Sequence, residues 1–364
     1  MKRRQFVGSL AAAATLSACA KSNPDRGSDC AGGQETFEWS CVTSWPPKFP
    51  GLGMAPENLA ARIEVASAGR LKIKVYGAGE LVPAFEVFDA VSRGTVEMGH
   101  DASYYHKGKV DAAQFFAAIP FGMTNLELNG WLYYGGGIAL WRELYAPFNL
   151  VPFPTGNTGV QMGGWFNKEI NSVDDLKGLK MRIPGLGGEV LRRAGGTPVT
   201  LPGSEIFTAL QTGAIDATEW VGPYNDASFG LHKAARYYYY PGWQEPGPGL
   251  ETIINKDAWN SLPADLQEIV STSCQAISAD MAAEYTHGNA MSLQQLSKDP
   301  KIEIRPFPKK VVSLLRLIAQ DVVDELMATN SAAAKIGKAY FDYLDIVSAN
   351  SRISEQAYLN TREP

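Results

Sequence analysis

The sequence lacks the residues that would assign it to several common classes of protein. Four cysteines among 364 residues are too few for a fold built on disulfides. Basic charge is also scarce, because 33 Lys and Arg residues stand against 38 Asp and Glu residues and give a formal net charge of −5. A nucleic-acid-binding protein needs a basic surface that neutralises phosphates, so the composition excludes nucleic acid as a partner.

Recognisable catalytic motifs are missing as well. The chain contains no GxSxG, HExxH, Walker-loop or paired CxxC pattern, and its four histidines do not have the spacing of metal ligands. The glycine-rich segment 185–188 opens a predicted helix, but it lacks the GxGxxG spacing of a dinucleotide site. These absences argue against an enzyme.

The sequence does contain enough apolar material for a large core. Hydrophobic residues make up 45% of the chain and aromatic residues 10%. With roughly 150 residues per domain as a guide, this length predicts two domains.

The first 18 residues predict an export signal, because a basic start is followed by a weakly apolar run and small residues. The apolar run, residues 9–18, is about half as long as a membrane-spanning helix. Residues 3–6 (RRQF) resemble a twin-arginine signal, and residues 16–19 (LSAC) resemble a lipobox that would place a lipid on Cys19. An ordinary basic start and cleavage within residues 18–20 (ACA) stay open as alternatives.

Export changes both the charge and the cysteine chemistry of the mature chain. Residues 1–18 carry three basic and no acidic residues, so their removal changes the formal net charge from −5 to −8. Residues 19–35 have the composition of a flexible tether. With Cys19 lipidated, Cys30, Cys41 and Cys274 remain, and we interpret them as structural; a Cys30–Cys41 disulfide is conceivable, but the sequence cannot establish it.

Segments rich in β-branched and aromatic residues alternate with segments whose apolar residues recur at helical spacing. In the first half, this pattern predicts strands at 37–42, 71–76 and 95–99 and helices at 56–68 and 83–93. In the middle, it predicts strands at 160–166, 180–183, 197–201 and 214–218 and helices at 187–194 and 204–212. Such alternation is typical of an α/β fold.

Two longer helical stretches follow. No proline interrupts residues 263–298, which as one helix would span about 54 Å and could brace two lobes, although Gly288 would weaken it. A second stretch, from Lys309 to about Ala349, dominates a C-terminal helical region at 309–364.

Three polar residues are unusual for a plain core. Arg182 interrupts a strand that reads as buried, and a buried guanidinium needs a carboxylate partner, either of the protein or of a ligand. Glu219 comes where a predicted strand ends, and Glu245 lies in a loop rich in turn residues. Carboxylates of this kind bind hard cations through oxygen, yet spacing alone would favour ordinary surface residues.

These segments carry a resemblance to a known family. The chain resembles the substrate-binding proteins of tripartite ATP-independent periplasmic (TRAP) transporters, and the likeness covers essentially the mature chain. The matching segments are TSWPPKFPG (43–51), GELVPAFEVFDAV (79–91), SYYHKGK (103–109), GNTGVQMGGWFNKEI (156–170), DDLKGLKMRIPGLGGEV (174–190), ALQTGAIDATEWVGPYND (209–226) and YYYYPGWQEPG (237–247). The GWF-NKEI and EWVGP versions resemble the branch that binds small 2-oxo or 2-hydroxy acids, such as pyruvate or lactate, together with a cation.

The resemblance implies a two-lobed α/β fold of the periplasmic solute-binding type, with a long helix spanning both lobes. Lobe I would comprise 36–155, completed by parts of 243–305, and lobe II 156–242, with the spanning helix at 263–298. The region 309–364 would offer a contact for a homodimer. The protein would be an exported periplasmic receptor that delivers its acid to the small and large TRAP membrane subunits.

The resemblance also implies a binding site. Arg182 would hold the substrate carboxylate, and Gln161 would contact both substrate and cation. Glu219, the main chain of Trp220 and Glu245 would complete the shell of a Na⁺ or Ca²⁺ ion. Tyr104 and Asn157 would donate hydrogen bonds to the substrate.

Two positions depart from the expected pattern, since His106 stands where we expect an aromatic residue such as Trp and Gln244 where histidine is common. Both flank predicted site residues. Two other functions stay open: a ligand-sensing module of the same fold without a transporter, and an exported enzyme that acts on a carboxylate.

Overall fold

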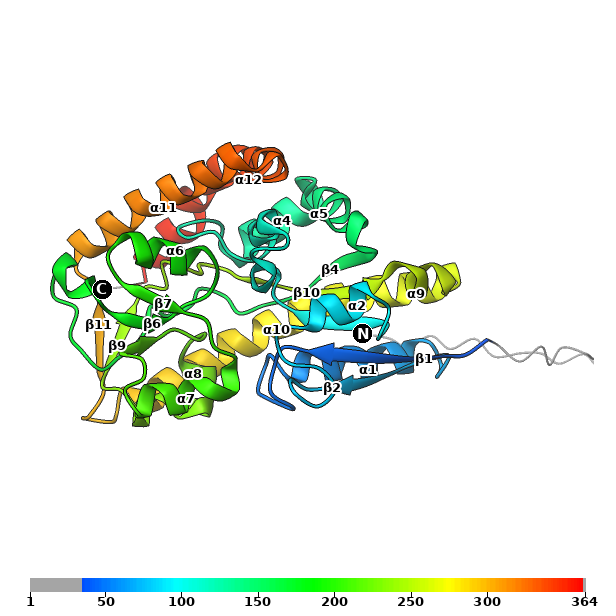
Figure 1. The fold of residues 1–364 in the computed structure, drawn as a ribbon, viewed down its shortest axis with the longest axis horizontal. Coiled ribbons are helices and arrows are strands. Elements are labelled where there is room, and N and C mark those ends of the chain that lie inside the picture. The colour runs from blue at the N-terminus through cyan, green and yellow to red at the C-terminus, as the bar shows by residue number, and fades with distance from the viewer. Residues whose placement is uncertain (1–34, 363–364) are drawn as a thin grey trace, which may run out of the picture. The chain divides into compact units, whose positions relative to one another are not determined.

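The computed structural model describes residues 35–362, which form an α/β structure with two β-sheets (Figure 1). The strands are β1 (Phe37–Thr43), β2 (Leu71–Tyr76), β3 (Met98–Asp101), β4 (Leu150–Asn157), β5 (Gly164–Phe166), β6 (Lys180–Arg182), β7 (Thr197–Val199), β8 (Ala217–Thr218), β9 (Tyr237–Tyr240), β10 (Gly249–Asn255) and β11 (Glu303–Pro306). The helices are α1 (Met54–Ala66), α2 (Val87–Ser92), α3 (Gln114–Ala117), α4 (Asn125–Tyr134), α5 (Gly137–Tyr145), α6 (Gly185–Arg193), α7 (Gly203–Gln211), α8 (Pro223–Phe229), α9 (Lys256–Ser261), α10 (Ala264–Leu296), α11 (Lys309–Thr329), α12 (Ser331–Ser351) and α13 (Ala357–Asn360).

The predicted export signal and most of the tether, including Cys19 and Cys30, lie outside the described residues. Within them, Cys41 and Cys274 are buried and form no disulfide. No helix of residues 35–362 combines the length and apolarity needed to cross a bilayer.

The first sheet has the strand order β2-β1-β3-β10-β4 and forms the core of the first lobe. Strands β1, β2 and β3 run parallel, as the predicted strand–helix–strand pattern requires, and α1 packs against β2. β10 comes from much later in the chain and pairs antiparallel with both β3 and β4. This insertion places Glu251 of β10 directly opposite Asp101 of β3.

The second sheet has the order β11-β9-β5-β8-β6-β7 and forms the core of the second lobe. Strand β6 lies parallel to β7 and β8, whereas β5 pairs antiparallel with β8 and β9. Two of the three crossings between the sheets are short segments, since β4 ends at Asn157 before β5 begins at Gly164, and β9 ends at Tyr240 before β10 begins at Gly249. The third crossing, from β10 to β11, contains the helix α10.

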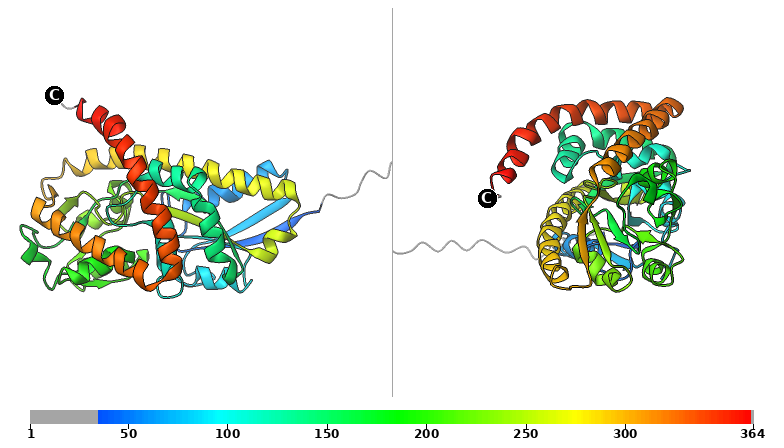
Figure 2. Two further views of the ribbon diagram at one scale, coloured as in Figure 1. Left: turned by 90° about the horizontal axis from the view of Figure 1, so that it is seen from above. Right: turned by 90° about the vertical axis from the view of Figure 1, so that its left-hand side faces the viewer.

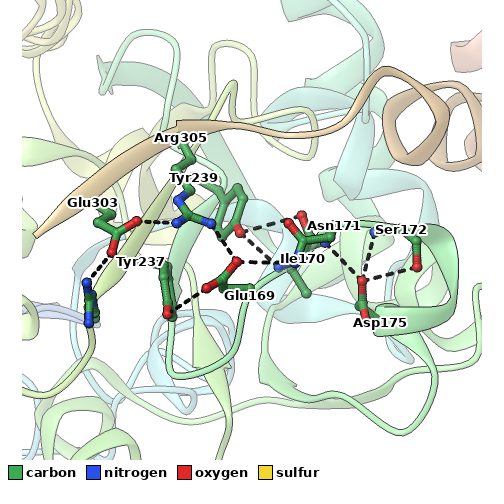
Figure 3. Close-up of polar contacts among 10 residues, drawn as sticks. Glu169, Ile170, Asn171, Ser172, Asp175, Tyr237, Tyr239, Glu303 and Arg305 are labelled. Atoms are coloured by element: carbon green, nitrogen blue, oxygen red, sulfur yellow. Dashed lines mark hydrogen bonds and ion pairs between the residues drawn. The ribbon is translucent and has the colours of Figure 1, made fainter.

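The edge strand β11 is fastened to the second sheet by side chains as well as by its pairing with β9. Figure 3 shows Arg305 reaching Glu169, at 2.8 Å between Nη1 and Oε2, while Tyr237 donates to the other oxygen of Glu169 at 3.0 Å. Hydrogen bonds from Arg305, Asn171 and Tyr237 lower the pKa of Glu169 to about 2. The late strand β11 therefore belongs to the second lobe.

Helix α10 spans both lobes (Figure 1). It packs on α1 and β4 of the first lobe and on α8 of the second. Gly288 does not break it, because its missing side chain gives room to Tyr224, whose Cγ lies 2.7 Å from where a Cβ would stand. Together the two sheets and this helix confirm the α/β fold with two lobes and a spanning helix.

The C-terminal helical stretch is divided at Asn330, which the sequence analysis did not anticipate. The backbone of Asn330 is extended, and its side chain accepts a hydrogen bond from the Ala333 N–H at 3.0 Å, so it caps α12. The chain changes direction there, and the C-terminal end of α12 extends from the body (Figure 2).

Several predicted strands are shorter than the pattern suggested. The strand predicted at 160–166 begins only at Gly164, because the Gln161 N–H bonds the Glu245 carbonyl and the Met162 N–H bonds that of Val221. The strand predicted at 214–218 is reduced to Ala217–Thr218. In both places, backbone groups turn away from the sheet toward the site described next.

Candidate functional site

A small polar cavity of about 10 Å³ lies between the two lobes, with room for roughly one water molecule. Both lobes supply aromatic and apolar walls, the second lobe also supplies a guanidinium, and the crossing segments supply polar groups. The lining residues are Trp45, Leu52, Tyr104, Tyr105, Thr158, Gln161, Arg182, Trp220, Val221, Pro248 and Leu250.

Arg182 ends β6 with its guanidinium buried at the cavity. Its Nη1 forms an ion pair with the Glu219 carboxylate and donates to the Glu219 main-chain oxygen at 3.1 Å, while its Nε donates to Leu201 O at 3.3 Å. Its Nη2 is buried without a hydrogen-bond partner among the described residues. One arm of the guanidinium is therefore fixed by the protein, and the other is available to a ligand.

Glu219 follows β8 and is as deeply buried as Arg182. Burial raises the pKa of its carboxyl to about 7, although the nearby Arg182 charge acts in the opposite direction. Its Oε2 has no hydrogen-bond partner among residues 35–362. The carboxylate thus keeps one oxygen free beside the Arg182 guanidinium.

Glu245 and Gln161 join the site from the two crossing segments. Gln161 Nε2 donates to Glu245 Oε2 at 2.8 Å and to Thr158 Oγ1 at 3.2 Å, and its Oε1 is buried without a partner in the described chain. The loop approaches closely enough only because residue 242 is glycine, since a Cβ there would collide with the Gln161 carbonyl. Burial, with the Glu219 charge second, holds the pKa of Glu245 well above its usual range.

Trp220 lines the cavity next to Glu219, and the Arg182 guanidinium lies over its ring at 5.1 Å. The turn after Trp220 is held by the buried Asp226, which accepts hydrogen bonds from the Val221 N–H at 3.2 Å and from Tyr238 at 2.8 Å. The backbone that presents Glu219 and Trp220 is therefore fixed from behind.

Tyr104 and Tyr105 face the site from the first lobe. Both belong to the short 3₁₀ turn η1 (Ser103–His106), and both line the cavity. Burial raises the pKa of Tyr105 to about 12 and that of Tyr104 well above its ordinary value, so both hydroxyls stay protonated. They can donate hydrogen bonds to an anion.

Asn157 is the predicted site residue whose side chain neither lines the cavity nor forms a hydrogen bond with a residue that does. It ends β4, where its Nδ2 donates to Gly247 O at 2.9 Å and its Oδ1 accepts from the Gly159 N–H at 2.8 Å. Its amide thereby joins the two crossing segments. The other six predicted residues, Tyr104, Gln161, Arg182, Glu219, Trp220 and Glu245, all line the cavity or contact a residue that does.

The oxygen atoms at this site suit a hard cation. Gln161 Oε1 and Glu219 Oε2 are buried and unpartnered in the described structure, and Glu245 lies against Gln161. Amide and carboxylate oxygens are the ligands that Na⁺ and Ca²⁺ take in proteins. The residues present therefore fit the predicted cation.

The two positions that depart from the expected pattern do not line the cavity. His106 turns away from it toward Asp101 and Glu251 of the first sheet. Gln244 donates from Nε2 to Met162 O at 2.9 Å, so it supports the segment that carries Gln161.

Sequence reasoning missed Trp45, Tyr105 and Thr158 as lining residues. Trp45 lies in the segment 43–51 that was quoted for the family resemblance, and its Nε1 donates to the buried His100 Nδ1 at 2.8 Å. That fixed orientation points the indole at Trp220, with ring centroids 6.4 Å apart. Tyr105 adjoins Tyr104, and its aromatic character was the available signal.

The lobes also meet through aromatic rings beside the cavity. Phe49 of the first lobe stacks on Phe229 at the end of α8, with ring centroids 4.3 Å apart. Asn225 of α8 donates to Pro50 O at 2.9 Å. These contacts join the two lobes directly.

Two α/β lobes, a spanning helix and a buried polar cavity between them define a solute-binding protein. The chain belongs to the bacterial extracellular solute-binding protein family 7, whose family model matches residues 41–330.

Individual relatives agree over almost the whole chain. A monocarboxylate 2-oxoacid-binding periplasmic protein of Nostoc sp. (strain PCC 7120) is 42% identical over 360 residues, which are 99% of this chain and 98% of that protein. The TRAP periplasmic solute-binding protein of Pseudoalteromonas atlantica T6c, solved with sodium and pyruvate, is 45% identical with a TM-score of 0.87 over 90% of this chain and 99% of that one. The corresponding protein of Colwellia psychrerythraea, solved with calcium and pyruvate, is 43% identical with a TM-score of 0.88 over 90% of this chain and 100% of that one. The resemblance to TRAP solute-binding proteins is thereby confirmed.

Proposed function

We propose that this protein is the extracytoplasmic receptor of a TRAP transporter and that it binds a small 2-oxo or 2-hydroxy monocarboxylate together with a cation. The observation that carries the proposal is the half-satisfied Arg182 guanidinium, buried at the cavity with its Nη2 unpartnered in the described structure. A carboxylate supplies the charge and the acceptor that this group needs.

The assignment of the acid rests on the cavity and on the relatives. Trp45, Tyr104 and Tyr105 line the same small cavity as Arg182 and restrict its size, which favours a small monocarboxylate over a longer dicarboxylate. Gln161 and the two tyrosine hydroxyls would form hydrogen bonds with the 2-oxo or 2-hydroxy oxygen. The pyruvate found in both solved relatives supports this class.

The cation would be held by Gln161, Glu219, Glu245 and the main chain of Trp220. When both carboxyl groups are ionised, Glu219 and Glu245 contribute two negative charges, Arg182 contributes one positive charge and the acid contributes a further negative charge. Because the sum of −2 would be buried, a bound cation is needed to offset it. Ca²⁺ makes the site neutral, whereas Na⁺ leaves one negative charge.

We further infer that the protein binds its acid without converting it and passes it to the small and large TRAP membrane subunits. The site holds no base paired with a nucleophile, since both carboxylates are engaged with Arg182 and Gln161. Periplasmic location fits the family, and we propose export by the twin-arginine route with lipid attachment at Cys19.

We also propose that the protein forms a homodimer through its C-terminal helices. Ile346 of α12 and Ile353, Tyr358 and Leu359 beyond it are between 53% and 80% exposed, on a helical end that leaves the body (Figure 2). Such an apolar face is unusual for a monomer in water. A second copy of the chain would cover it.

Titration calorimetry with pyruvate, lactate and succinate in calcium-containing buffer tests the proposed ligand class. Pyruvate or lactate should bind with one site per chain, and succinate should bind far more weakly. Mass spectrometry of acids that co-purify with the protein identifies the natural ligand. Tight succinate binding, or no binding of any monocarboxylate, would refute the proposed class.

A further inference from the structure

A second group of charged side chains is buried away from the cavity, in the first lobe. His106 Nε2 lies 2.9 Å from Glu251 Oε1 and 3.4 Å from Asp101 Oδ1. The side chains of all three residues are 2% exposed or less. None of them lines the cavity between the lobes, so ligand binding as proposed above does not explain them.

The fold brings these residues together from distant points of the chain. Asp101 ends β3, and Glu251 stands opposite it on the antiparallel strand β10. His106 ends the η1 turn that follows β3. The β3–β10 pairing thus sets two carboxylates side by side, and η1 places an imidazole over both.

The cluster has unused coordination capacity. Asp101 Oδ1 and Glu251 Oε2 are buried and accept no hydrogen bond among residues 35–362, although Asp101 Oδ1 has the 3.4 Å ion-pair contact with His106. Glu251 Oε1 accepts from His106 or from the Tyr145 hydroxyl, which lies 3.2 Å away. Buried oxygens without partners are costly, and two adjacent carboxylates carry charge that the single imidazole cannot fully balance.

One ligand atom from each residue lies within 4.8 Å of the other two. Atoms bound at about 2.1 Å to one metal ion are separated by roughly 3 to 3.5 Å, and the distances from His106 Nε2 to Glu251 Oε1 (2.9 Å) and to Asp101 Oδ1 (3.4 Å) are close to that spacing. An imidazole nitrogen with two carboxylate oxygens suits a divalent first-row transition metal better than Na⁺ or Ca²⁺, which prefer oxygen alone.

We propose that Asp101, His106 and Glu251 form a second, buried site for a divalent transition-metal ion such as Zn²⁺. The ion takes the place of a proton on His106 Nε2, and its two charges balance the two carboxylates. The site fastens η1, which carries Tyr104 and Tyr105, to the first sheet.

Zinc binding by the whole protein tests this site. After chelation and dialysis against Zn²⁺ with excess Ca²⁺ present, elemental analysis should find one Zn²⁺ per chain in the wild type. His106→Phe should lose that ion, because it removes the imidazole ligand. The aromatic replacement fits there, since Phe88 already packs on the His106 ring at 4.3 Å. His287→Phe, at an exposed position on α10, is the matched control and should retain it.

Glu219→Gln separates this site from the cation site of the proposed function, and it should also keep the Zn²⁺. Equal zinc content in the wild type and in His106→Phe would overturn the proposal. Should His106→Phe fail to fold, anomalous diffraction at the zinc edge from wild-type crystals decides the matter. A peak between His106, Asp101 and Glu251 is expected, and its absence would overturn the site whatever the affinity for pyruvate.

Discussion

Arg182 and Glu219 form an ion pair in which each side chain is 1% exposed. The ion pair does not use all the polar atoms of either side chain. Arg182 Nη2 and Glu219 Oε2 are both without partners in the described structure. An ion pair of this depth is stable only when its remaining atoms are also satisfied. A substrate carboxylate would satisfy Arg182 Nη2, and a cation would satisfy Glu219 Oε2. Because both ligands contact the same ion pair, the binding of one should favour the binding of the other.

Arg182→Ala should weaken pyruvate binding at least about 100-fold, or about 3 kcal/mol, because a buried charge-assisted contact is lost. From sequence alone, we expect this variant to keep its fold. The structure adds a cost, since Glu219 would remain buried without a partner and unfolding would become easier by roughly 3–5 kcal/mol.

Calorimetry and urea unfolding measure the two effects separately. The double variant Arg182→Ala/Glu219→Gln should recover much of the stability without recovering the binding. Near-native affinity in either variant would show that Arg182 is not the carboxylate clamp.

Removal of cations should weaken pyruvate binding, and Ca²⁺ should restore it better than Na⁺, by roughly tenfold or more, because only the divalent ion neutralises the buried site. Titrations in chelated, sodium-free buffer, with each ion then added back, measure this. Glu245→Gln removes one negative charge and should shift the preference toward Na⁺. Unchanged affinity after complete cation removal would exclude a cation from the site.

Phe229→Ala should weaken binding about tenfold and mainly by faster dissociation, because the Phe49–Phe229 stack joins the two lobes. Stopped-flow kinetics with pyruvate gives both rate constants. Tyr134→Ala, at a 94% exposed position on α4, serves as the control and should bind like the wild type. An effect confined to the association rate would contradict the assigned role.

Asp226 should make stability depend on pH in the acidic range. Burial raises its pKa to about 6 from an ordinary value of 3.8, so the folded protein holds this proton more tightly than the unfolded chain does. The contribution of Asp226 to the free energy of unfolding therefore falls by up to about 3 kcal/mol as the pH rises from about 4 to 6, and it is constant above pH 6.

Urea unfolding of the wild type and Asp226→Asn across this range isolates the effect. The free energy of unfolding of the variant must be subtracted from that of the wild type at each pH. Exposed acids with lowered pKa values, such as Glu169, make stability rise with pH and would otherwise mask the effect of Asp226. A difference between the two proteins that does not change with pH would contradict the assignment.

The double variant Ile346→Asp/Ile353→Asp should convert a dimer into a monomer, because it places charge in the apolar face of the C-terminal helices. Light scattering coupled to gel filtration reads the mass directly. Leu317→Asp, at an exposed site on α11, should leave the assembly unchanged. A wild type that is monomeric at all concentrations would rule out the dimer.

Much of the architecture follows from local sequence signals. The predicted strands 37–42 and 71–76 match β1 and β2 closely, because both have strong alternation and clear glycine or proline boundaries. Strand β10 escaped the sequence analysis, since a continuous buried run inserted from a distant part of the chain has no local pattern. The division at Asn330 was missed because a single capping residue interrupts two strongly helical segments.

The site residues that could be predicted from the sequence are charged side chains in segments that otherwise look like part of an apolar core. Arg182 in a buried strand and Glu219 at a strand end stood out for that reason, and the structure places them in contact. Asp101, His106 and Glu251 could not have been joined from the sequence, because only the β3–β10 pairing makes them neighbours. Asn157 was predicted to donate a hydrogen bond to the substrate, but its side-chain amide bonds the backbone of the crossing segments instead.

The walls of the cavity are unequally divided between the lobes, and this division sets an order of events. Arg182, Glu219, Gln161 and Glu245 contact one another through the second lobe and the crossing segments. The aromatic wall of Trp45, Tyr104 and Tyr105 belongs to the first lobe. Charge capture can therefore be complete while the lobes are still apart, and closure afterwards governs how long the acid stays. Arrival rate and residence time could then be tuned by mutations in different lobes.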